Sequence, residues 1–314
     1  MTDLPLVSIP VITYNSSKTI VETLDSIYNQ TYQNIELIVS DDCSTDNTVE
    51  ICRQWISNHN DRFYHIDIIE APVNTGISAN MNRAEKACNG EWVKGIAGDD
   101  IMLPECISDC INYILNNNGT NCLFGKIEAF GEDKKYCEWL TETFSLRNDT
   151  MAKLSRDELY TMILKGETPP APAFFYNRIF FSSKGIINDE RIPNIEDLPK
   201  WLNILNKGVV FAFLDKRIVR YRIGGFSTSS KWDSLNAYKS KRLLYFYYQF
   251  EPHYTNNLDN AIKEVVDHEC KIYQEFLSSK EKLLNIKKTA SYRIGHIIIT
   301  PFRLATKIWG KNKL

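Results

Sequence analysis

The sequence predicts an α/β protein with a mostly parallel central sheet flanked by helices, followed by a mainly helical C-terminal region. Three observations support this. Strand-like and helix-like patterns alternate through residues 7–97, the chain of 314 residues is long enough to bury a substantial core, and residues after 230 are helical in pattern with few Gly or Pro. Strict alternation predicts parallel strands, because a parallel pair needs a crossover connection that is usually a helix.

Each element is predicted from the spacing of its apolar residues. In the first helix, for example, Ile20, Leu24 and Ile27 recur at helical intervals. The expected strands are residues 7–13, 36–40, 65–70 and 91–97, and the expected helices between them are residues 17–30, 44–58 and 78–89. Beyond Pro104 we expect helices over 105–117 and 155–165, an extended segment over 121–130, and a Pro-rich loop over 168–175.

The bulk composition is that of an ordinary globular protein. Charged residues make up 24% of the chain and the formal net charge is -2, so nothing in the overall charge calls for a nucleic-acid partner. The eight cysteines are scattered without a second pair at zinc-ligand spacing, and we expect free thiols in a reducing cytoplasm.

The chain carries no sequence signal for secretion or for membrane insertion. The N-terminal apolar run has no basic flank, and no stretch of about 18 apolar residues is present. We therefore expect a cytoplasmic protein. The tail, residues 291–314, mixes apolar and basic side chains, and two interpretations remain open: an interfacial segment on the inner face of an anionic membrane, or a helix packed on the rest of the protein.

Polar residues follow three of the predicted strands, at the point where each strand ends. These stretches are "ITYN" (12–15), "VSDDCSTDNT" (39–48) and "AGDD" (97–100). The carboxyl ends of parallel strands share one edge of a sheet, where ligands bind in open α/β folds. Taken alone, Asp99 and Asp100 favour a solvated turn, because acidic turns are common, whereas the convergence of the three stretches favours a divalent-cation site.

The ordered succession of these stretches resembles the inverting family-2 glycosyltransferases of the GT-A fold, which is Rossmann-like. The matching blocks are "VSIPVITYNSSKTIVETLDSIYNQTYQNIELIVSDDCSTDNT", "NTGISANMNRAEKACNGEWVKGIAGDD", "IEDLPKWLNILNKG" and "YRIGG", and they span about residues 5–225. The resemblance implies a glycosyltransferase domain over residues 1–229. The pattern of the remaining residues, 230–314, predicts a separate helical C-terminal region, for which contact with a membrane or a partner is one interpretation.

The resemblance also implies roles for individual residues. Tyr14 would stack on the nucleotide base and Asp42 would bind the base edge. The remaining residues carried over are Ile12 and Asp99 in the nucleotide site, Asp100 as metal ligand, and Asp197 with Glu196 as the catalytic carboxylates, Asp197 being the base. The chain departs from the family pattern at Ile12, at Cys43, and at Gly98 and Gly224, where many members have Asp and His.

Elementary chemistry supports these roles but leaves structural alternatives. An aromatic face can stack on a base, a carboxylate can accept the uracil imide N–H, and hard cations prefer oxygen ligands. Alternatively, Tyr14 is a half-buried aromatic at a strand end and Asp42 a turn or cap residue. Glu196 and Asp197 can equally be first-turn helix acids, which the helix dipole favours.

The predicted function is transfer of a hexosyl or N-acetylhexosaminyl group from a nucleotide-diphosphate donor, in the first place a UDP-sugar, with Mg²⁺ or Mn²⁺ as cofactor. The acceptor would be a saccharide or lipid-linked saccharide in surface polysaccharide or glycolipid biosynthesis. One alternative is a non-catalytic nucleotide-sugar-binding module. A nucleotidyltransferase is disfavoured because "ITYNSSKT" is not a Gly-rich, basic phosphate loop.

Overall fold

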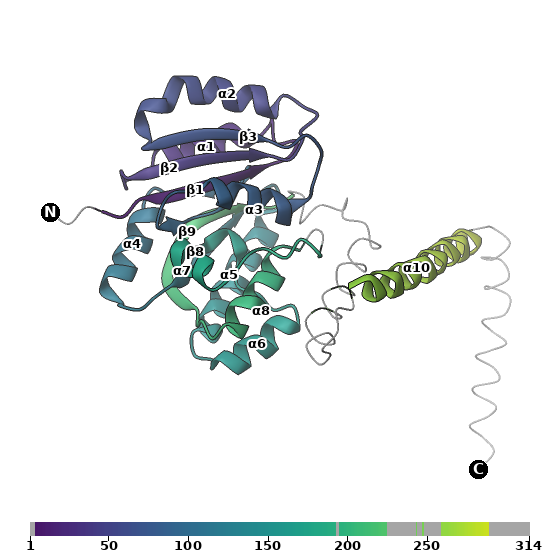
Figure 1. Ribbon diagram of the computed structural model, residues 1–314. Coiled ribbons are helices and arrows are strands. Elements are labelled where there is room, and N and C mark those ends of the chain that lie inside the picture. The colour runs from purple at the N-terminus through teal and green to yellow at the C-terminus, as the bar shows by residue number, and fades with distance from the viewer. Residues whose placement is uncertain (1–3, 193–194, 225–242, 244–246, 248–258, 289–314) are drawn as a thin grey trace, which may run out of the picture.

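The computed structural model describes residues 4–192, 195–224, 243, 247 and 259–288. Within these residues a nine-stranded sheet runs in the order β3-β2-β1-β4-β8-β7-β9-β6, with β5 also pairing β1. Helices cover the sheet on both sides, and the long helix α10 extends to one side of it (Figure 1). The predicted α/β class, with a mostly parallel sheet flanked by helices, is confirmed.

The N-terminal part of the sheet is parallel throughout. Its strands are β1 (Val7–Thr13), β2 (Ile35–Asp41), β3 (His65–Glu70), β4 (Trp92–Val93) and β5 (Ile96–Ala97), and its helices are α1 (Ile20–Tyr28), α2 (Thr48–His59) and α3 (Ile77–Ala87). β1 pairs β2 on one edge, from Val7 opposite Ile35 to Thr13 opposite Asp41. On its other edge it pairs β4 and β5. A strand paired on both edges and buried on both faces needs mostly apolar side chains, which β1 has, and its two polar side chains, Ser8 and Thr13, donate hydrogen bonds to Glu36 and Asp41 of β2.

The second part of the sheet mixes parallel and antiparallel pairs. Its strands are β6 (Ile101–Met102), β7 (Cys122–Phe130), β8 (Phe174–Asn177) and β9 (Ala212–Arg222). Its helices are α4 (Cys106–Asn116), α5 (Lys134–Met151), α6 (Arg156–Leu164), α7 (Arg178–Ser183), α8 (Asp197–Asn206) and, further on, α10 (Asp259–Lys288), with 3₁₀ turns at Asn60–Arg62 and Ala171–Ala173. β7 and β9 are parallel, whereas β8 runs antiparallel to β4 and β7, and β6 antiparallel to β9.

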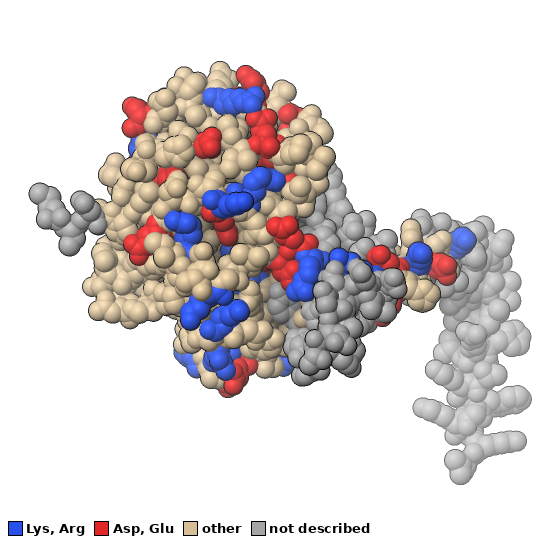
Figure 2. Space-filling model, viewed as in Figure 1, with Lys and Arg blue, Asp and Glu red and all other residues tan. Residues whose placement is uncertain are grey.

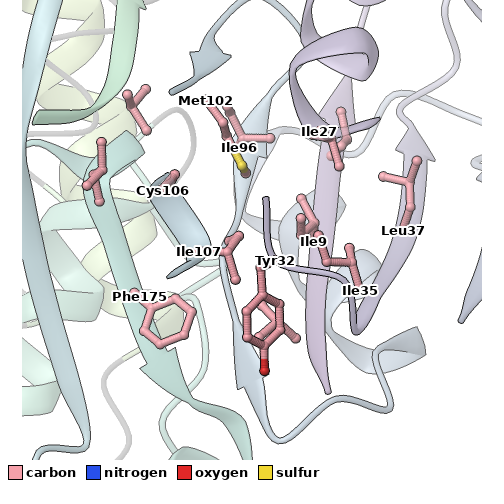
Figure 3. Close-up of a cluster of buried hydrophobic side chains, with 14 of the residues drawn as sticks. Ile9, Ile27, Tyr32, Ile35, Leu37, Ile96, Met102, Cys106, Ile107 and Phe175 are labelled. Atoms are coloured by element: carbon pink, nitrogen blue, oxygen red, sulfur yellow. The ribbon is translucent and has the colours of Figure 1, made fainter. Parts of the chain in front are cut away.

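Two apolar clusters form the core, one on each face of the sheet. Leu37 and Val39 of β2 point into the first cluster and Ile38 into the second, as the alternation of side chains along a strand requires. The first cluster includes side chains of α1, α2 and α4, among them Ile27 and Ile107, and Figure 3 shows part of it. The second cluster includes buried side chains of α6 and α8.

Most of the predicted elements are confirmed to within a few residues, and two predictions need correction. The strand expected over residues 91–97 is two short strands, because the chain leaves the sheet at Lys94 and Gly95. The loop expected over 168–175 ends early, since Phe174 and Phe175 are buried in β8. The helix predicted after residue 230 is present over 259–288, whereas the boundary near 229 and the tail over 291–314 lie outside the described residues.

The surface and the cysteines also agree with the sequence. Figure 2 shows basic and acidic side chains interspersed over the face in view, in keeping with the net charge of -2. All eight cysteines are free thiols. In the part of the chain that the structure describes, no helix has the length and apolar character that a bilayer crossing requires.

Candidate active site

A single cavity brings together the two acidic pairs that the sequence singled out. The cavity has a volume of about 390 Å³, and Asp99, Asp100, Glu196 and Asp197 all line it, together with Ile12. It lies where β1 and β5 end, and the Pro-rich segment 168–172 forms part of its wall. The carboxylates after β5 and those at the start of α8 therefore meet in one place, as expected for the carboxyl edge of the sheet.

Backbone hydrogen bonds fix the first acidic pair between β5 and β6. The backbone carbonyl of Asp100 accepts a hydrogen bond from the Thr23 hydroxyl at 2.8 Å, and the side-chain Oδ1 of Asp100 accepts one from the Arg222 backbone N–H at 2.9 Å. The Arg222 Nε donates to the Asp99 carbonyl oxygen at 2.7 Å. Residue 98 must be small, because a Cβ at Gly98 would lie 2.9 Å from the Thr13 methyl carbon. The family's frequent Asp therefore does not fit at this position without a local shift.

Burial makes the first acidic pair electrostatically strained. Burial together with the adjacent Asp99 carboxylate holds the pKa of Asp100 well above its usual range, and burial also raises the pKa of Asp99. The nearby Lys94 ammonium opposes this effect. Lys94 is fully buried and donates to the carbonyls of Gly95 and Pro172, which ties the Pro-rich wall to the break between β4 and β5.

Two neighbouring carboxylates that resist ionisation suit a divalent cation, which would stabilise their charged forms. Within the described ranges no group of three or more His, Cys, Asp and Glu is arranged as a metal site. A protein-only cage is not required, however, because Mg²⁺ sites often use one or two carboxylates and leave the remaining positions to phosphate and water. Asp99 and Asp100 fit such a shared site by donor chemistry.

The second acidic pair begins helix α8. Glu196 precedes the first helical residue, Asp197, whose Oδ1 accepts from the Leu198 backbone N–H at 2.7 Å. Burial and the neighbouring Asp197 carboxylate raise the pKa of Glu196 to about 8, and burial also raises the pKa of Asp197. The two carboxyls are adjacent, so they titrate together. A carboxylate beside a protonated neighbour in a sheltered pocket can serve as a general base.

The two residues expected at the nucleotide base lie at the same sheet edge but outside the cavity lining. Tyr14 follows β1 with 44% of its surface exposed, so its ring is accessible to a ligand. Asp42 follows β2 and is 3% exposed, and its backbone N–H donates to the Thr13 carbonyl at 2.9 Å. The polar groups after β1, β2 and β5 thus converge on one edge of the sheet. Of Ile12, Tyr14 and Asp42, only Ile12 lines the cavity that contains the acidic pairs.

Asp42 also braces the start of helix α3. Its carboxylate accepts from the backbone N–H groups of Thr75, at 3.0 Å, and Gly76, at 2.8 Å, and forms an ion pair with Arg83 at 2.9 Å. Gly76, the N-cap of α3, has a φ of 85°, which favours glycine. The structural alternative for Asp42 is therefore real, and its contact with a base stays a prediction.

Sequence reasoning missed several polar residues of this region. Glu85 and Lys200 line the cavity from α3 and α8, and Lys94 lies behind its Pro-rich wall. The sequence contains a signal for two of these residues: Lys94 and Lys200 are the single charged residues in the apolar runs "WVKGIA" and "LPKWLNIL". A lone charge in a buried run has to find a partner, but its identity depends on tertiary contacts.

The α/β sheet with acidic groups at its carboxyl edge is the arrangement that the sequence predicted. The family model described as "Glycosyl transferase family 2" matches residues 8–178. Because this match covers more than half of the chain, the chain belongs to glycosyl transferase family 2.

Curated relatives agree with this membership. An uncharacterized glycosyltransferase of Haemophilus influenzae is 28% identical over 261 residues, covering 79% of this chain and 76% of the relative. The putative teichuronic acid biosynthesis glycosyltransferase TuaG of Bacillus subtilis is 24% identical over 245 residues, covering 78% and 88%.

Solved structures confirm the fold. S. aureus TarS 1-349 in complex with UDP-GlcNAc matches with a TM-score of 0.58 at 22% identity, covering 76% of this chain and 64% of that one, so the chain spans less than two thirds of that structure. The mannosyltransferase PcManGT from Pyrobaculum calidifontis, in complex with GDP-Man and Mn2+, matches with a TM-score of 0.55 at 14% identity, covering 93% and 83%.

Replacing Asp42 tests both of its roles. Asp42→Ala removes the hydrogen bonds from the Thr75 and Gly76 N–H groups and the ion pair with Arg83, so we expect the free energy of unfolding to fall by about 1–3 kcal/mol. We also expect UDP affinity, measured by calorimetry, to fall about tenfold or more. Asp157→Ala, at a side chain 85% exposed on α6, is the control and should change stability by less than about 0.5 kcal/mol. Wild-type UDP affinity in folded Asp42→Ala protein would reject the base contact.

The raised pKa of Glu196 predicts a pH-dependent stability. Between about pH 4.5 and about pH 8 the folded state holds a proton that the unfolded state has released, so this contribution to stability falls as pH rises through that window. Asp197 and Lys200 are the charged groups acting on it. Glu196→Gln cannot titrate, so the unfolding free energy of the wild type relative to this variant should decline with pH. A difference that stays constant with pH would contradict the shift.

Proposed function

We propose that this chain transfers a hexosyl or N-acetylhexosaminyl group from a UDP-sugar to an acceptor hydroxyl, with inversion at the anomeric carbon. The observation that supports this most strongly is the meeting of Asp99 and Asp100 with Glu196 and Asp197 in one cavity at the carboxyl edge of the sheet. One pair suits the diphosphate end of a donor and the other suits an acceptor hydroxyl. A binding module without catalysis would have no use for the second pair.

Asp197 is the proposed general base. Burial and the neighbouring Asp197 carboxylate raise the pKa of Glu196 to about 8, which makes Glu196 the weaker candidate for the base. Asp197 then takes the proton of the acceptor hydroxyl while the hydroxyl oxygen attacks C1 and the bond from C1 to the diphosphate oxygen breaks. A single displacement inverts the configuration and needs no covalent intermediate on the protein.

The donor would lie across the ends of β1, β2 and β5. Tyr14 presents an exposed ring for stacking on uracil, and Asp42 would accept the imide N–H beside Ile12. Asp100, with Asp99 beside it, would hold Mg²⁺ or Mn²⁺, which when bound neutralises charge on the departing diphosphate. The backbone N–H of Arg222 orients Asp100 for this role.

The acceptor is proposed to be a saccharide or lipid-linked saccharide used in a surface polysaccharide or glycolipid. The similarity to TuaG of Bacillus subtilis, a putative teichuronic acid biosynthesis glycosyltransferase, supports this class of pathway. Neither the formal net charge of -2 nor the interspersed charges in Figure 2 indicate a nucleic-acid partner. A cytoplasmic location, with membrane contact through the tail, remains part of the proposal.

Loss of Asp197 and loss of Asp100 should impair the enzyme differently. Asp197→Asn keeps the size of the side chain but removes the base, so we expect nearly normal donor binding and transfer reduced by about 10² to 10⁴ fold. Asp100→Asn should instead weaken Mn²⁺-dependent UDP binding, because a neutral amide is a poorer ligand for a hard cation. Calorimetry of UDP with and without Mn²⁺, run beside a transfer assay, separates the two effects.

Two outcomes would overturn these roles. Wild-type turnover by Asp197→Asn would move the base elsewhere, with Glu196 the first candidate. UDP binding that is indifferent to Mn²⁺ in the wild type would remove the metal role of Asp100.

A further inference from the structure

A buried ion pair forms part of the wall of the same cavity. The Lys200 Nζ on α8 lies 2.7 Å from the Glu85 Oε1 on α3, and the two side chains are 5% and 15% exposed. Both residues line the cavity that holds Glu196 and Asp197. An ion pair this sheltered is costly to form unless its geometry is good or it has a function.

Neighbouring groups hold both members of the pair in place. The Lys200 Nζ lies 4.6 Å from the centroid of the Tyr176 ring, within cation–π range. The Asn188 Nδ2 lies 3.4 Å from the Glu85 Oε2, and Asn188 is itself held by Asn82, whose Oδ1 accepts from its backbone N–H at 3.0 Å and its Nδ2 at 2.8 Å. The pair therefore presents its charged atoms in a fixed orientation before any ligand arrives.

The position of the pair relative to the proposed base determines what it can contact. Lys200 lies one helical turn after Glu196, so the two project from the same side of α8. The acceptor hydroxyl must approach Asp197, and the donor C1 must approach that hydroxyl. The sugar ring attached to C1 therefore has to occupy this cavity, with the ion pair as part of its wall.

The chemistry of the pair selects an uncharged sugar. A carboxylate beside an ammonium offers one acceptor and one donor, and a hydroxyl or acylamino group can use both. The positive charge of Lys200 is already neutralised by Glu85, and the other acids of the cavity are Asp99, Asp100, Glu196 and Asp197. A uronic acid would therefore bring a further negative charge into an acidic pocket without a free cation on this pair to meet it.

We infer that Glu85 and Lys200 determine donor specificity by hydrogen-bonding the hydroxyl or acylamino groups of an uncharged hexosyl donor. This inference rests on the proposed function. The competing explanation is that the pair only braces α3 against α8, which would support every donor equally. The two explanations differ in whether the preference between sugars changes when the pair is removed.

The test compares donors that differ in one feature. UDP, UDP-glucose, its C4 epimer UDP-galactose, UDP-GlcNAc and UDP-glucuronate are titrated into the wild type and into the double variant Glu85→Met/Lys200→Met. Replacing both partners with apolar groups of similar length leaves no unpaired buried charge. Lys216→Met is the matched control, because it removes a Lys–Asp ion pair with Asp109 at a lysine 57% exposed and outside the cavity lining.

We expect the wild type to prefer one uncharged sugar over the others by about tenfold or more and to bind UDP-glucuronate most weakly. In the double variant the preference should shrink towards unity while the affinity for UDP itself is unchanged, and Lys216→Met should retain the wild-type preference. If the double variant does not fold, Glu85→Gln decides, because loss of the carboxylate alone should reduce the preference and relax the rejection of UDP-glucuronate.

Several results would overturn the inference. These are an unchanged preference in the folded variant, an equal loss of affinity for UDP and for all sugars, which indicates a brace, or a wild-type preference for UDP-glucuronate. Failure of the wild type to bind UDP or any of the sugars overturns the proposed function as well, and this result is distinct from normal binding without a role for the pair.

Discussion

The site depends on one constraint, the pairing of β1 along both of its edges. All seven residues of β1 are buried, with β2 in parallel register on one side and β4 and β5 on the other. Thr13 lies opposite Asp41 and Ile12 opposite Ala97, so β1, β2 and β5 end at nearly the same level of the sheet. Because parallel strands end at one edge, the register of the strands gathers the polar residues that follow them.

Gathering carboxylates in a sheltered cavity has an electrostatic cost that the fold offsets locally. Burial raises the pKa of Asp99, Asp100, Glu196 and Asp197, and each pair also has a cation nearby, Lys94 for the first and Lys200 for the second. The cations are themselves tied to other parts of the wall, through the Pro172 carbonyl and the Glu85 carboxylate. The two lysines therefore both offset the charge of the acidic pairs and hold the wall of the cavity in place.

The sequence predicts the parts of the molecule that depend on local pattern. Periodicity locates β1, β2, β3 and their helices, and the family blocks single out both acidic pairs. Helix α5 was not predicted, because its buried positions Cys137, Thr141 and Asn148 carry little apolar signal. The antiparallel insertion of β8 between β4 and β7 depends on tertiary packing of Phe174 and Phe175 rather than on a turn signal.

The contact between Glu85 and Lys200 joins residues 115 positions apart, and no single-sequence pattern specifies it. The fully buried Lys94 is a similar case, because an apolar run with one lysine does not reveal which carbonyls will accept its hydrogen bonds. The central claim is that the two acidic pairs serve one transfer reaction, the first at the diphosphate of the donor and the second at the acceptor hydroxyl. It is tested most directly by a crystal structure of the protein grown with UDP and Mn²⁺. The account predicts an anomalous Mn²⁺ peak at Asp100, uracil on the Tyr14 ring, and the diphosphate directed into the cavity towards Asp197. Nucleotide bound away from the ends of β1, β2 and β5, or in the cavity without contact to Asp100, would contradict it.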